Sequence, residues 1–177
     1  MVFLEVTMDD EVTVPYDVIT SQNQTHQEIV FLDLYLKNTS ENASKEYGYY
    51  ISLATINPIS NITLHQDISC IVFSVTFSYT TMKPCQGEIL VGTVTEIHEN
   101  GIVLQSGPLK TIFLSKNRME DYEFNLSNEP MFLKVKGSSY IKEGTKVRFR
   151  VLDVKWIRRE EAFNIEATIL GDYLGPI

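Results

Sequence analysis

The sequence is poor in the side chains from which most protein metal sites are built. Among its 177 residues there are two cysteines and three histidines. Cys70 and Cys85 form no Cys-x-x-Cys pair, and the histidines are scattered without ligand spacing. They are His26, His65 and His98. The sequence therefore predicts no metal site, and it indicates that both cysteines are reduced, structural thiols.

Catalytic motifs are missing as well. The chain contains no P-loop, no Gly-x-Ser-x-Gly element and no His-Glu-x-x-His helix, and its glycines begin no dinucleotide fingerprint. Its carboxylate pairs, such as Asp9-Asp10 and Glu160-Glu161, are adjacent in sequence. Adjacent carboxylates give no sign of converging on a substrate and are typical of solvated surface. We therefore predict a protein that is not an enzyme, with no catalytic residues and no cofactor.

Long apolar runs are absent too, since nothing approaches the roughly 20 residues that a membrane span requires. The first residues, 1–5, contain no basic leader and end in a carboxylate. We expect a soluble protein of the cytosol or nucleus with no membrane partner. Its Asn-x-Ser/Thr sequons are then chance matches in a chain rich in these residues.

Basic residues are scarce in one half of the chain. Residues 1–83 hold three Lys/Arg and ten Asp/Glu, a net charge of −7, while residues 84–177 hold twelve and thirteen, a net charge of −1. The whole chain carries −8. This asymmetry predicts two units with different partners, of which only the second suits a polyanion.

Residues 1–83 are predicted to form a small α+β domain. Strand-like runs occur at 2–6, 12–14 and 47–53, and Pro15 closes the second of them. A longer strand over 68–79 alternates two sets of side chains. The set expected to line the core is Ile71, Phe73, Val75, Phe77 and Tyr79. The Lys83-Pro84 step is a natural end for this domain.

One helix is expected in the same domain. Thr25 and Glu28 have the spacing of a capping box, after which apolar residues recur at helical spacing. The apolar face is wider than one core surface requires. Either the helix is unusually buried within its own domain or it is shared with a partner protein. On the second reading Phe31 and Tyr35 are partner-interface candidates.

Residues 84–177 are predicted to form a five-stranded OB-fold barrel. A strand over 89–97 carries Gly92, and Glu99-Asn100-Gly101 is a tight-hairpin signal leading into Ile102. Further strand patterns follow after the turn at 106–108, and an irregular excursion separates the third strand from the last two. A glycine such as Gly92 permits the sharp bend of so small a barrel.

OB barrels receive single-stranded nucleic acid near the loop that joins their last two strands. The sequence predicts that loop at 155–159, where the only tryptophan stands among three cations. Trp156 could stack a base while Lys155, Arg158 and Arg159 hold phosphates. Alternatively, Trp156 plugs the barrel and the cations are solvated. A second set of RNA-binding candidates alternates along one strand and could equally be an ordinary charged face: Lys146, Arg148 and Arg150.

Several short segments, in order and spacing, resemble a known family. Residues 86–94, 101–108 and 171–175 resemble the stalk subunit 7 of eukaryotic RNA polymerase II and its archaeal counterpart. Residues 46–50 stand where that family has a Phe-Gly-Tyr strand. Trp156 and the Leu-Gly-Pro ending look more like the variants of the plant silencing polymerases IV and V.

The resemblance implies a non-catalytic nuclear protein that serves transcription or gene silencing. Its acidic tip domain, residues 1–83, would dock on the polymerase core and bind a subunit 4 homologue. Tyr47, Gly48 and Tyr49 are then further partner-interface candidates. The OB domain would project near the RNA exit and contact nascent single-stranded RNA. Ile102 stands where the family often has Phe, which implies weak RNA binding because a stacking ring is removed.

A competing interpretation is a free-standing single-stranded RNA-binding protein of translation or RNA decay. Such a protein needs a more basic surface than a net charge of −8 provides, because phosphate neutralisation supplies most of the non-specific affinity.

Overall fold

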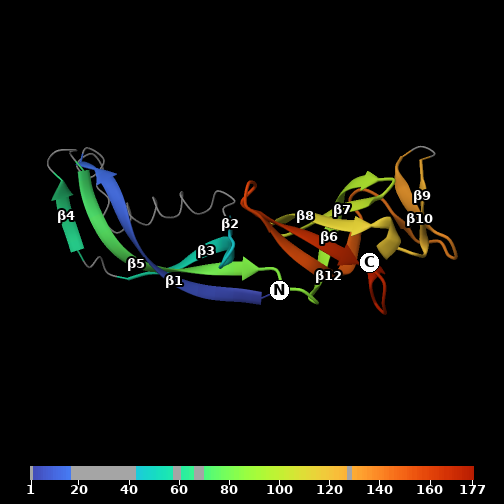
Figure 1. The fold of residues 1–177 in the computed structure, drawn as a ribbon, viewed down its shortest axis with the longest axis horizontal. Helices are drawn as coiled ribbons and strands as arrows, with labels where there is room; N and C mark the ends of the chain where they lie inside the picture. The colour runs from blue at the N-terminus through green and yellow to red at the C-terminus, as the bar shows by residue number, and fades with distance from the viewer. Residues whose placement is uncertain (1, 17–42, 58–60, 66–69, 127–128) are drawn as a thin grey trace. The chain divides into compact units, whose positions relative to one another are not determined.

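The computed structural model describes residues 2–16, 43–57, 61–65, 70–126 and 129–177 (Figure 1). Strands are the main secondary structure of these residues, which divide into two compact units, one over Phe3–Lys83 and the other containing Pro84–Ile177. The helix predicted after Thr25 lies outside the described residues, as do its candidates Phe31 and Tyr35. No helix in the described ranges is long and apolar enough to cross a membrane.

The first unit contains one sheet whose strands run in the order β1-β5-β3-β2, and β4 pairs with β5. Its strands are β1 (Val2–Pro15), β2 (Ala43–Ser44), β3 (Gly48–Ile56), β4 (Asn61–His65) and β5 (Cys70–Lys83). The prediction of two short strands before residue 15 is wrong, because β1 is continuous. Its polar middle stays in the sheet since Asp9 accepts a hydrogen bond from Thr76 Oγ1 on β5, at 2.5 Å.

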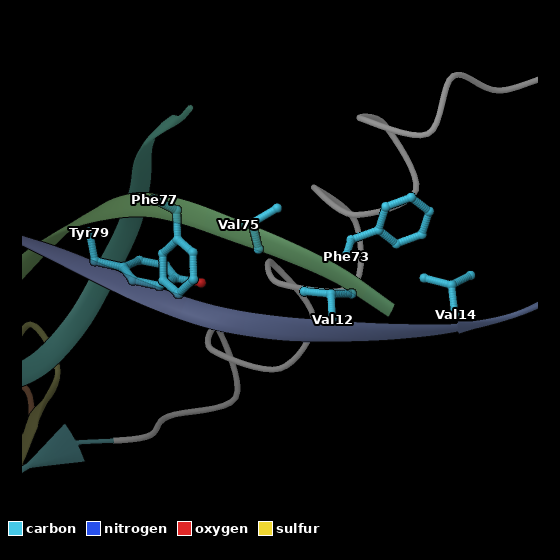
Figure 2. Close-up of a cluster of buried hydrophobic side chains, with 6 residues drawn as sticks. All are labelled: Val12, Val14, Phe73, Val75, Phe77 and Tyr79. Atoms are coloured by element: carbon cyan, nitrogen blue, oxygen red, sulfur yellow. The ribbon is translucent and has the colours of Figure 1, made fainter. Parts of the chain in front are cut away.

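The core of the first unit is built from side chains of the neighbouring strands β1 and β5. Figure 2 shows the alternating side chains of β5 gathered with Val12 and Val14 of β1. Phe73, Val75 and Phe77 are at most 2% exposed, as is Tyr79, so the expected core set is confirmed for these four. The fifth member, Ile71, is partly buried against the same cluster. Strict alternation predicted this face because successive strand residues point to opposite sides.

The second unit contains a closed ring of five strands. They are β6 (Ile89–His98), β7 (Gly101–Ser106), β8 (Leu109–Ser115), β12 (Lys146–Ile157) and β13 (Ala162–Thr168). β6, β7 and β8 pair antiparallel in order, β8 pairs parallel with β13, β13 pairs with β12, and β12 pairs with β6. Inward side chains fill the ring, including the fully buried Leu104, Ile112, Leu114, Val147, Phe149 and Ile165.

Two glycines of the ring make room for their neighbours. The Asn-Gly hairpin is confirmed, since a turn at Glu99 and Asn100 leads directly into β7 at Gly101. A Cβ on Gly92 would lie 3.0 Å from the Gln105 carbonyl oxygen and 3.1 Å from the ring of Phe149. Gly92 therefore lets the neighbouring strand and a core ring approach closely.

The excursion between β8 and β12 is more regular than predicted. A 3-10 turn, η2 (Lys116–Arg118), is followed by a three-stranded antiparallel sheet of β9 (Tyr122–Asn125), β10 (Met131–Lys134) and β11 (Tyr140–Ile141). Phe132 of β10 and Ile141 of β11 are fully buried. The rings of Phe124 and Phe132 meet edge to face, with centroids 5.6 Å apart. A last short strand, β14 (Gly175–Pro176), pairs with β12.

Candidate nucleic-acid interface

The segment predicted as the last loop of the barrel is mostly strand. β12 runs to Ile157, so Lys155 and Trp156 lie on a strand, and the connection to β13 is the turn at residues 158–161. The loop prediction is wrong because β12 stays paired with β13 beyond the bulge between Val151 and Asp153. This pairing continues through Trp156, which lies opposite Phe163. Only Arg158 and Arg159 of the predicted set are in the turn.

Trp156 is part of the end of the barrel core. Its ring meets Phe163 edge to face, with centroids 4.8 Å apart and an angle of 62°. Phe163 is 4% exposed, whereas Trp156 is half-buried. Edge-to-face packing uses part of the indole surface. The packing on Phe163 agrees with the reading in which Trp156 plugs the barrel, whereas a contact between the remaining indole surface and a base stays a prediction.

Lys155 forms ion pairs with two neighbouring carboxylates. Its Nζ lies 3.0 Å from Glu166 Oε1 and 3.1 Å from Asp153 Oδ2, all on the outer surface of β12 and β13. The hydrogen bond to Glu166 and then that to Asp153 raise the pKa of Lys155. The Lys155 hydrogen bond in turn lowers the pKa of Asp153, and the Val154 N–H adds to the effect. Lys155 is charged, but its charge already faces two carboxylates.

The other predicted cations are less compensated. Arg158 and Arg159 are exposed in the turn, and neither forms an ion pair within the described ranges. Lys146 and Arg150 are exposed on β12 and likewise form none with any described residue, while Arg148 is half-buried and donates a hydrogen bond to the Tyr173 carbonyl oxygen. Arg158 and Arg159 therefore lie just after the end of β12, whereas Lys146, Arg148 and Arg150 lie in its first half.

An aromatic ring that the sequence analysis did not single out lies on the outer surface of β8. Phe113 is half-buried, pairs across the strands with Val103, and its ring lies 3.0 Å from where a Cβ of Gly101 would stand. It borders a hollow of about 420 Å³. The other lining residues are Ser115, Asn117, Arg118, Leu152, Glu166 and Ala167. The alternation of Thr111, Phe113 and Ser115 with buried Ile112 and Leu114 was the signal that could have found it.

Ile102 does not mark a lost stacking ring. Its side chain is fully buried in the barrel, so a ring at this position would enter the core and could not reach a base. The outward aromatic surface comes from the next strand, at Phe113. The argument for weak RNA binding from Ile102 is therefore wrong, because the alternation of side chains along β7 places this residue inside the barrel.

The candidates of residues 47–49 are mostly internal. A Cβ on Gly48 would lie 2.3 Å from the Met82 carbonyl oxygen, and its φ of +88° favours glycine. Tyr49 is 6% exposed and pairs with Met82. Only Tyr47, half-buried in the turn before β3 with its N–H donating to Ser44 Oγ, has surface left for a partner. Proximity to Glu46, with some desolvation, raises the pKa of Tyr47.

No group of three or more His, Cys, Asp and Glu side chains that could hold a metal ion occurs among the described residues. Cys70 is half-buried and Cys85 exposed, and no disulfide joins these two described residues.

The chain is similar to known proteins over nearly its whole length. It is 31% identical to RNA polymerase V subunit 7 of Arabidopsis thaliana, covering 99% of this chain and 98% of the relative. RNA polymerase IV subunit 7 of the same plant is 34% identical, covering 98% of this chain and 99% of the relative. Its RNA polymerase II subunit 7 is 26% identical, over 80% of each chain. No family model matches the sequence. Identity above 30% along full-length relatives shows that the chain belongs to the subunit 7 family of DNA-directed RNA polymerases.

Proposed function

We propose that this chain is a non-catalytic stalk subunit of a nuclear, multisubunit RNA polymerase of the polymerase IV and V type. The observation that carries the proposal is the match over nearly the full length to subunits 7 of both polymerases. The identity to the polymerase II subunit is lower and covers less of the chain. Purification of the native complex, followed by mass spectrometry of its largest subunit, identifies the polymerase; recovery as a free protein without polymerase subunits refutes the assignment.

The proposal includes an OB domain over residues 84–177. Five strands in a closed ring, a parallel β8–β13 pair and an excursion before β12 support this assignment. In OB folds the outer surface of the second and third strands receives single-stranded nucleic acid. Here those strands are β7 and β8, the strands that bear Val103 and Phe113.

The first unit is the proposed tip domain, residues 1–83, which docks on the polymerase core and binds a subunit 4 homologue. Its net charge of −7 and its wide apolar segment at 29–36 support this role. Co-expression with the cognate subunit 4 should give a one-to-one complex with a raised melting temperature, because binding to the folded state stabilises it. A stable, non-aggregating monomer that ignores this partner would contradict the proposal.

The RNA contact is proposed on the barrel surface between the Phe113 hollow and the β12–β13 turn. Phe113 and the free part of Trp156 supply aromatic surface, and Arg118, Arg158 and Arg159 supply exposed cations. Aromatic surfaces next to cations are the means by which single strands are bound without sequence readout. Lys155 contributes less, because Glu166 and Asp153 occupy it.

The RNA contact is tested by salt-dependent binding of a short unstructured RNA. Phe113→Ala and Trp156→Ala should each weaken the free energy of RNA binding by about 1–3 kcal/mol if a base stacks on the ring. Arg158→Ala/Arg159→Ala should flatten the salt dependence, because fewer counterions are released. Tyr140→Ala, which removes a 50% exposed ring from β11, is the matched control. If all variants are folded and bind as the wild type does, the site is wrong although the polymerase assignment still stands.

A further inference from the structure

One face of the second unit combines exposed apolar side chains with cations. It is formed by the outer surfaces of β6 and β12 and by the C-terminal segment, and we call it the β6–β12 face. Ile89 is 50%, Val91 42% and Tyr173 89% exposed. The cations are Lys146, Arg148 and Arg150. Exposed apolar side chains gathered in one place mark interaction surfaces more often than chance.

The strand register places these side chains in alternation. Arg150 is paired with Ile89, and Arg148 with Val91, in the antiparallel β6–β12 ladder. Directly opposite residues of such a ladder share a face and stand about 4.5–5.5 Å apart at Cβ. Each arginine therefore lies beside a half-exposed aliphatic side chain.

The C-terminal segment completes the β6–β12 face. β14 pairs with β12 at Arg148, and Arg148 Nη1 donates a hydrogen bond to the Tyr173 carbonyl oxygen at 3.3 Å. Tyr173 has a φ of +62°, a conformation that strains a residue other than glycine, and nearly all of its side chain is exposed. Strained backbone of this kind is found preferentially at functional positions.

The three cations of the β6–β12 face form no ion pairs with described carboxylates, in contrast to Lys155 further along the same strand, which faces two carboxylates. Asp172, next to Tyr173 in sequence, also forms no ion pair within the described ranges. A ligand that carries negative charge would therefore meet the arginines without displacing a carboxylate of the described residues.

We propose that the β6–β12 face binds an extended acidic segment of a partner polypeptide, whose glutamates on one side present carboxylates to the arginines and methylene stems to Ile89 and Val91. Same-face residues of an extended chain repeat about every 6.6–6.8 Å, the repeat of Arg148 and Arg150 along β12. A protein ligand is favoured over RNA because the apolar side chains paired with the arginines, Ile89 and Val91, are aliphatic, which leaves Tyr173 of the C-terminal segment as the one ring of this face for base stacking. Tyrosine and arginine are also the residues enriched at protein interfaces.

The test uses the full chain and two fluorescent probes, a peptide of alternating glutamate and serine and an unstructured uridine oligonucleotide. Arg148→Ala/Arg150→Ala should weaken peptide binding about tenfold at low salt and much less at high salt. Val91→Ser should weaken it about fivefold at both salt concentrations, because an apolar contact is not screened. The oligonucleotide should bind all of these variants as it binds the wild type.

Lys134→Ala/Lys136→Ala is the matched control, since it removes two positive charges from β10 and the bend after it and should leave peptide binding unchanged. The proposal is overturned if the peptide fails to bind the wild type, if the control weakens it as much as the arginine variant does, or if the arginine variant loses the oligonucleotide instead. Circular dichroism of each variant establishes that it is folded. The outcome is independent of the polymerase assignment and of the RNA site at Phe113.

Discussion

Replacement of Gly48 by alanine should destabilise the first unit severely. The φ of +88° alone disfavours an L-residue by about 1–2 kcal/mol. In addition, the new Cβ would stand 2.3 Å from the carbonyl oxygen of Met82 and 2.8 Å from the Cα of Lys83. These are backbone atoms of the paired strand β5, which cannot rotate away, so the strands must separate. Overpacking of this kind costs about 1–3 kcal/mol.

The two effects together predict a loss of about 2–5 kcal/mol, a large fraction of the about 5–15 kcal/mol that holds a typical domain folded. Urea denaturation measures it. Trp156 is the only tryptophan and lies in the second unit, so its fluorescence follows the barrel, while far-UV circular dichroism follows both units. With a slope of about 1–3 kcal/mol per molar urea, the dichroism transition of the first unit should move down by about 1–2 M. The tryptophan transition should stay in place.

Gly87 provides the matched control. Its φ is +84°, but nothing lies within 4 Å of the Cβ that alanine would add. Gly87 belongs to the second unit, so Gly87→Ala should show the conformational effect of about 1–2 kcal/mol without the clash, as a shift of the tryptophan transition. Equal losses in the two variants would show that the approach of β3 to β5 at Met82 is looser than described. A Gly48→Ala protein as stable as the wild type would refute the whole argument.

Three further substitutions probe the barrel. Phe149→Ala removes a fully buried ring and should lower the free energy of unfolding by about 3–5 kcal/mol, measured by tryptophan fluorescence in urea. Gly101→Ala should also destabilise the barrel, because its Cβ would stand 2.4 Å from the Leu114 carbonyl oxygen; wild-type stability would contradict this. Lys155→Met should raise the pKa of Asp153 toward the ordinary value of 3.8, followed by carboxyl NMR. Because pairing lowers this pKa, its contribution to stability exists above the ordinary carboxyl pKa and disappears as the pH falls through the lowered value.

Local pattern was sufficient for much of this molecule. Strict alternation in β5 identified Phe73, Val75, Phe77 and Tyr79 as core, since side chains of a strand alternate between two faces whatever lies beyond. The Asn100-Gly101 step marked a hairpin, because few other residues adopt the required turn. The order and spacing of several short segments also indicated the family, and relatives that match nearly the full length confirm it.

The candidate site depended on contacts between distant segments. Lys155 looked like a free cation, yet its charge is paired with Glu166 of the neighbouring strand. Trp156 looked like a loop residue, but pairing with Phe163 extends β12 through it. Ile102 faces the core and Phe113, which the sequence analysis did not single out, faces outward, because the closure of the ring determines which face of β7 and β8 is outside. Sequence fixes which residues alternate, whereas the pairing of strands decides which alternate set meets solvent and which charges meet one another.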